Sequence, residues 1–142
     1  MTQFSFPARF SRDKHDGGYV ITFRDVPEAI TQGESLDDCF EQGAGAVQAA
    51  LEARMLSGID IPNATQPRRG ERLVAVPIQT ALKAALYIEL RRTGTTRVAL
   101  ARRLHIDEKE ARRMLDPHHP TKADRLERAL AILGKHVELH VA

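Results

Sequence analysis

Two adjacent histidines, His118 and His119, lie in the segment DPHHPTKAD (residues 116–124), between two stretches with helical periodicity. Such a pair can hold a metal ion, act in acid–base catalysis or contact phosphate. A metal site needs further ligands, but the only cysteine is Cys39 and no carboxylate cluster adjoins. Catalysis needs a nucleophile that the histidine can activate, and none is evident. We therefore expect no metal, no cofactor and no catalytic residue here, which leaves a phosphate contact or a solvent-exposed loop.

The histidines follow a strongly basic stretch. Residues 91–113 contain eight Lys or Arg and three Asp or Glu, and residues 71–142 carry a net charge of +5. Residues 1–70 carry −3 instead. This asymmetry indicates two partners of opposite charge character, although charge runs are often only solvated faces.

The basic stretch has the pattern of two short capped helices. Thr96 is expected to cap the first helix, at 96–104. Asp107 is expected to cap the second, at 108–115, with Glu110 in the reciprocal capping position. Two short helices joined by a tight turn are typical of a helix-turn-helix, whose second helix enters the major groove of DNA. A helical bundle with a basic surface is the alternative.

The second helix has one side suited to reading bases. On a 3.6-residue period, one group of polar residues falls opposite Ala111 and Leu115. These residues are Glu108, Lys109, Arg112 and Arg113. Lys and Arg can donate to guanine O6 and N7, and a glutamate can accept from cytosine N4.

The segment after that helix can face a phosphate strand. Thr121 is expected to cap the next helix, with Lys122 in its first turn. Backbone N–H groups at a helix start, a hydroxyl, an ammonium and imidazoles all suit phosphate. We therefore count His118, His119, Thr121 and Lys122 among the expected DNA-binding residues.

The elements that must position these residues fall into two parts divided near residue 77. Before residue 77, apolar alternation predicts a hairpin over 4–11 and 19–23 around Asp16-Gly17-Gly18. A short strand is expected near 30–32, and a strand over 73–76 would return to the sheet. Between them, a helix is expected from Ser35 to about 56. After residue 77, helices are expected at 78–92 and 121–133, and alternation of Val137, Leu139 and Val141 predicts a terminal strand.

An enzymatic function is the competing interpretation. Carboxylates of the N-terminal half could bind Mg²⁺ in a metal-dependent nuclease, although most fall in turns, where acidic residues are common. They are Asp13, Asp16, Asp25, Glu28 and Glu34. A repressor whose N-terminal domain senses a small ligand is a further alternative.

Two stretches together resemble the HicB antitoxins of HicA–HicB toxin–antitoxin systems, in the branch with a C-terminal helix-turn-helix. They are GGYVITFRDVPEAITQGESLDDCFEQGAGAV (17–47) and LARRLHIDEKEARRMLDPHHPTKADRLERALAILGK (100–135). The likeness covers nearly the whole chain. It implies an α+β chain, with a partial RNase H-like sheet and one packed helix followed by an all-α helix-turn-helix domain with a terminal β-strand.

The resemblance also implies function. The N-terminal domain would bind a HicA-type toxin, a small mRNA-cleaving protein, without activity of its own. The C-terminal domain would dimerise and bind operator DNA, with Arg97 at a position that contacts phosphate. His105 stands where the motif usually has Gly, and Arg97 replaces the usual Gln.

We therefore expect a cytoplasmic, non-enzymatic antitoxin that represses its own operon. Residues 1–77 would form the toxin-binding domain, with contacts at Asp25, Pro27 and Glu28. Residues 78–142 would form the DNA-binding and dimerisation domain, with the terminal strand pairing with its copy in a homodimer.

Overall fold

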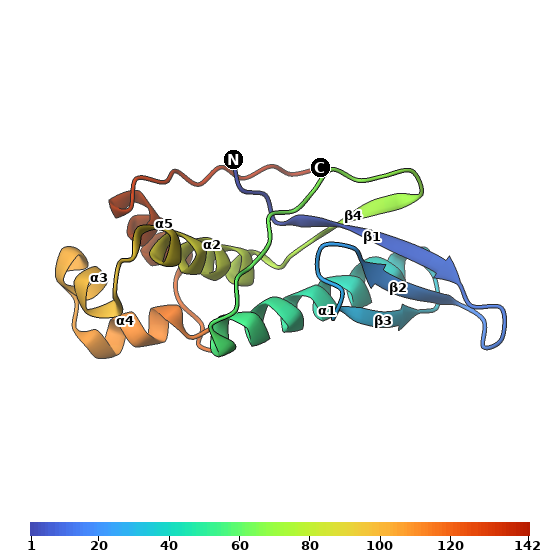
Figure 1. The fold of residues 1–142 in the computed structure, drawn as a ribbon, viewed down its shortest axis with the longest axis horizontal. Coiled ribbons are helices and arrows are strands. Elements are labelled where there is room, and N and C mark those ends of the chain that lie inside the picture. The colour runs from blue at the N-terminus through green and yellow to red at the C-terminus, as the bar shows by residue number, and fades with distance from the viewer. The chain divides into compact units, whose positions relative to one another are not determined.

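The computed structural model describes residues 1–142. The chain divides into two compact units, Met1–Pro77 and Ile78–Ala142. The first is a four-stranded sheet with one helix, and the second contains four helices (Figure 1). The expected α+β class is confirmed at this level. No helix is long and apolar enough to cross a membrane.

The sheet consists of β1 (Ser5–Arg12), β2 (Tyr19–Phe23), β3 (Ile30–Gly33) and β4 (Glu71–Ala75). Its order is β3-β2-β1-β4, and every neighbouring pair is antiparallel. The predicted hairpin, third strand and returning strand are therefore confirmed. The register places Ala8 opposite Phe23 and Phe6 opposite Val74, so these apolar side chains share one face of the sheet.

Helix α1 (Leu36–Ser57) covers that face, as predicted (Figure 1). It starts where Ser35 Oγ accepts a hydrogen bond from Asp38 N at 3.1 Å, and it ends at Gly58, whose φ is +69°. Val47 and Leu51 are fully buried. A β-carbon at Gly43 would lie 3.5 Å from Ile21 and Phe23, an ordinary van der Waals contact, so this position of the helix lies directly against the sheet.

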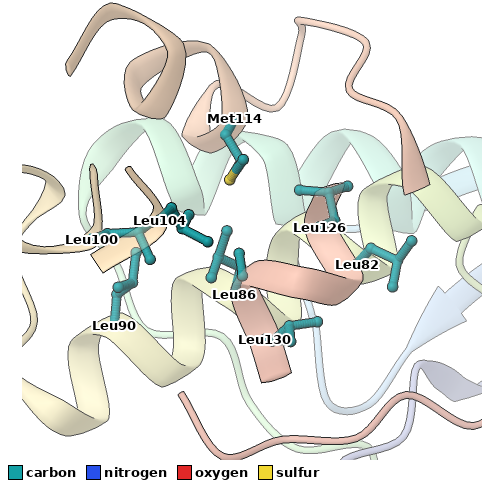
Figure 2. Packing of buried hydrophobic residues seen from close by; sticks show 9 residues of the cluster. Leu82, Leu86, Leu90, Leu100, Leu104, Met114, Leu126 and Leu130 are labelled. Carbon is teal, nitrogen blue, oxygen red and sulfur yellow. The ribbon is translucent and has the colours of Figure 1, made fainter. Parts of the chain in front are cut away.

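The second unit contains α2 (Ile78–Thr93), α3 (Arg97–Leu104), α4 (Glu108–Leu115) and α5 (Ala123–Ile132). All four contribute to one apolar cluster (Figure 2). Its buried members are Leu82, Leu86, Leu90, Leu100, Leu104, Met114, Leu126, Ala129 and Leu130. Burying a leucine side chain stabilises a fold by about 1.5–3 kcal/mol, so the burial of this cluster is the main contribution that holds the four helices together.

Side-chain caps set the starts of α3 and α4, as predicted. Thr96 Oγ1 accepts from Ala99 N at 3.1 Å, and Asp107 Oδ1 accepts from Glu110 N at 2.7 Å. His105 ends α3 with φ +56° and ψ +42°, the left-handed conformation expected at that position. This conformation costs a residue with a β-carbon roughly 1–2 kcal/mol, which glycine avoids.

One expectation for the C-terminal part is wrong, and another is not met within the single chain. Residues 135–142 form no strand here, because no neighbouring strand offers them a hydrogen-bonded ladder, and their pairing with a second copy stays a prediction. Thr121 is not the cap of α5: the cap is Lys122, whose carbonyl accepts from Arg125 N and Leu126 N. The Thr121 N–H is bonded to Gln79 Oε1 at 2.7 Å, and the helix begins only at Ala123.

Candidate functional site

The outer side of α4 is available to a partner. Ala111 is fully buried and Met114 is 3% exposed, so these residues fix the helix against the apolar cluster. The four residues predicted to face bases are all exposed: Glu108, Lys109, Arg112 and Arg113. Their common exposure follows from the helical period.

An ion pair links the starts of α3 and α4. Arg97 Nη2 lies 2.9 Å from Glu108 Oε1, and both side chains are more than two-fifths exposed. Because an exposed pair contributes only about 0–1 kcal/mol, either side chain can exchange this partner for another at small cost. Arg97 and Glu108 are therefore adjacent, although they lie 11 residues apart.

Five of the predicted residues line one cavity of about 430 Å³ beside α4 and the start of α5. They are Lys109, Arg113, His119, Thr121 and Lys122. The other four predicted residues, Arg97, Glu108, Arg112 and His118, do not line it. These residues are spread over positions 109–122, and their spacing in the sequence does not indicate that they line the same cavity.

The residues that line the cavity carry a net positive charge. Arg125 of α5, which the sequence reasoning missed, adds a fourth cation and forms an ion pair with Glu110. The second lining carboxylate, Asp107, caps α4. With the histidine neutral, four cations face two carboxylates, a balance that favours an anion such as phosphate.

The segment between α4 and α5 rests on a buried lysine that was also missed. Lys83 is 1% exposed, and its Nζ donates to the carbonyls of Arg113, Asp116 and His119 at 3.1, 2.6 and 2.5 Å. Desolvation lowers the pKa of Lys83, and the nearby Asp116 carboxylate opposes this. The available signal was a lysine within the apolar stripe of 78–92, at the spacing of Leu86 and Leu90.

In the first unit, the three residues expected to contact a toxin differ in their surroundings. The Asp25 carboxylate, 7% exposed, accepts from Thr65 N at 2.8 Å and from Thr65 Oγ1 at 2.9 Å. Glu28 pairs with Arg54 Nε at 2.5 Å, and this hydrogen bond lowers the pKa of Glu28. Only Pro27 is exposed without such a bond. Asp25 and Glu28 thus already act in holding loops to the sheet and helix.

Pro27 lines a second cavity, of about 380 Å³, together with three arginines. They are Arg9, Arg24 and Arg68, with Glu71 among them. Arg24 donates to both carboxylate oxygens of Glu71, at 2.9 and 3.2 Å. These bonds, and one from Arg68 N, lower the pKa of Glu71 to about 2. The pair ties β4 to the end of β2.

The carboxylates considered for a nuclease are not gathered. Asp13 Oδ1 accepts from the backbone N–H groups of His15 and Asp16 within its turn, and Glu34 N donates to Asp38. No group of three or more His, Cys, Asp or Glu side chains is arranged to hold a metal ion.

Comparison with known proteins gives a consistent result. Residues 5–85 match the family described as HicB_like antitoxin of bacterial toxin-antitoxin system. The chain is 33% identical over 134 residues to antitoxin HicB 2 of Photorhabdus laumondii, which covers 94% of each protein. It is 32% identical over 124 residues to antitoxin HicB of Escherichia coli K12, covering 87% of this chain and 90% of that protein. The chain therefore belongs to the HicB-like antitoxin family of bacterial toxin–antitoxin systems.

Proposed function

We propose that this protein neutralises a HicA-type, mRNA-cleaving toxin by binding it directly, and that it represses its own operon by binding operator DNA. The observation that carries the proposal is the combination of two features in one chain. The first is membership of an antitoxin family. The second is an exposed basic helix, α4, in a unit distinct from the sheet. The role requires no catalytic residue and no cofactor, and it belongs in the bacterial cytoplasm, where mRNA and operator DNA are found.

Toxin binding is assigned to the unit Met1–Pro77, because a protein that binds RNA is basic and residues 1–70 carry a net charge of −3. Among Asp25, Pro27 and Glu28, the exposed Pro27 is the strongest candidate for a direct contact. Asp25 and Glu28 support the loops around it through Thr65 and Arg54.

Co-expression of the tagged chain with the product of the neighbouring gene in its operon tests toxin binding. We expect a small basic protein to co-purify in a defined ratio and its mRNA cleavage to stop in the complex. An RNA-cleaving activity in the purified chain alone, lost with EDTA or with Asp25→Asn, would instead support the nuclease interpretation.

DNA binding is assigned to α3 and α4 as a helix-turn-helix. In this arrangement Lys109, Arg112 and Arg113 reach base edges from α4, and Arg97 contacts phosphate from the start of α3. The cavity lined by His119, Thr121 and Lys122 adds a second phosphate contact, with His118 beside it. The support is the exposure of these side chains and the positive balance of the cavity.

Arg112→Ala and Arg113→Ala test this assignment. Each is expected to weaken binding to the operator duplex by about 1–3 kcal/mol, because each removes a donor to base edges. Toxin binding should be unchanged, since neither residue belongs to the first unit. Electrophoretic mobility shifts on the upstream DNA measure the effect, and unchanged shifts for both variants contradict the assignment.

The same proposal includes a homodimer, because palindromic operators are bound by two-fold symmetric proteins. The tail supplies a candidate interface. Val137, Leu139 and Val141 alternate and are 42%, 71% and 89% exposed, and residues 136–142 belong to no strand in the single chain. Pairing with the tail of a second copy would satisfy its backbone and cover this apolar side.

A truncation after Gly134 is expected to shift the protein from dimer toward monomer in sedimentation velocity, because it removes the pairing strand. Glu138→Gln, which keeps the tail length and its apolar side chains, is the control and should leave the dimer intact. A truncated chain that stays fully dimeric would rule out the tail as the interface.

A further inference from the structure

We propose that Lys83 and Gln79 of α2 are positioning residues for DNA recognition: they hold the segment from the end of α4 to Thr121 so that the base-facing and phosphate-facing side chains are correctly placed. The inference rests on the proposed DNA binding. It adds to it two residues that are not expected to touch DNA and that lie outside the helix-turn-helix.

Lys83 donates to three main-chain acceptors. Its ammonium has three protons, and three carbonyls accept them, at Arg113, Asp116 and His119. The first carbonyl belongs to the last turn of α4, where the carbonyls carry partial negative charge that a cation stabilises. The other two belong to the loop with the histidines. One side chain therefore fixes both the end of the helix and the path that follows it.

Gln79 holds the far end of the same segment. Its Oε1 accepts from Thr121 N at 2.7 Å, immediately before α5 begins. Gln79 and Lys83 are four residues apart in α2, so they lie on one side of that helix, one turn from each other. A single turn of α2 thus bonds to residues 113, 116, 119 and 121.

This anchoring determines which groups the segment offers to solvent. With the three carbonyls bonded to the ammonium, the side chains of His118, His119 and Lys122 remain exposed. Asp116 adds local order, because its Oδ1 accepts from His118 N at 2.9 Å and its carbonyl accepts from His119 N at 3.1 Å. The loop is therefore prepared for its contacts before DNA binds, which lowers the entropy that binding must overcome.

An apolar side chain at position 83 would fill the space without making these bonds. Because the site is buried, the three carbonyls would lose the ammonium and keep only local bonds, such as those from Asp116 N to Arg113 O and from His119 N to Asp116 O, and the segment would move to reach water or another donor. The end of α4 would move with it. The expected consequence is a loss of sequence discrimination that exceeds the loss of general affinity for DNA.

The test compares full-length Lys83→Met and Gln79→Met with Lys14→Met, a matched control. Lys14 is exposed in the hairpin turn of the first unit, so its replacement removes the same charge without touching the second unit. Two duplexes serve as probes: one selected from a random library by the wild-type chain, and one of scrambled sequence. Affinities are measured at 10 °C in sucrose, where circular dichroism establishes that each variant is folded.

We expect Lys83→Met to bind the selected duplex at least about tenfold more weakly than Lys14→Met, with Gln79→Met about threefold weaker, since specificity depends on placed donors. Binding to the scrambled duplex should match the control. The Thr121 amide should also exchange hydrogen faster in Gln79→Met. A residue that only stabilises the fold would lower the melting temperature and leave the discrimination between the duplexes unchanged.

Selected-duplex affinity equal to that of the control in folded Lys83→Met overturns the inference. If Lys83→Met does not fold, Gln79→Met decides in the same way, because it leaves the buried charge in place. A wild-type chain that selects no duplex would refute the proposed DNA binding itself, before any variant is compared.

Discussion

The surface of α3 and α4 depends on the burial of a few leucines. Each helix has eight residues, well below the roughly 12–15 at which an isolated helix becomes marginally stable in water. Leu100 and Met114 place them against Leu86 and Leu126, which are fully buried. Fully burying one such side chain contributes about 1.5–3 kcal/mol, whereas a hydrogen bond adds a net value of about 1 kcal/mol. Burial therefore decides that these helices exist, and the polar bonds decide where they begin and end.

The first unit separates these roles in the same way. Its stability comes from α1 lying on the apolar face of the sheet, where Phe6, Ile21 and Val74 are almost completely buried. Its charged groups mostly fix loops: Arg24 bonds to Glu71 and to Thr65 Oγ1 at 2.7 Å. Such groups resemble site residues in a sequence, because both are polar and lie beside turns. Their bonds within the fold show which of them a partner can reach.

Sequence patterns predicted most of the fold, because local chemistry decides it. Alternation with Asp16-Gly17-Gly18 predicted the hairpin, and Ser35, Thr96 and Asp107 predicted helix starts that depend only on nearby N–H groups. The predicted exposure of the outer side of α4 followed from the helical period. These features need no information from distant parts of the chain.

The remaining features depend on partners distant in sequence or absent from the chain. Lys83 bonds to carbonyls 30 or more residues away, and a carbonyl has no residue type by which a pattern could identify it. Thr121 is not a cap because α5 begins only at Ala123, and the Thr121 N–H bonds to Gln79, 42 residues earlier. Alternation in the tail predicts a two-sided segment, but a strand also requires a neighbour to pair with. The cavity beside α4 likewise becomes visible only when α5 is in place.

In the proposed function, one chain neutralises a toxin with its first unit and binds operator DNA with its second. The most direct measurement places an inducible toxin gene and a reporter driven by the operon promoter in the same cells, with either the wild-type chain or the Arg112→Ala/Arg113→Ala double variant at equal levels. We expect that both chains prevent growth arrest and that only the wild type represses the reporter. A folded double variant that still represses fully, or that fails to prevent growth arrest, would contradict it.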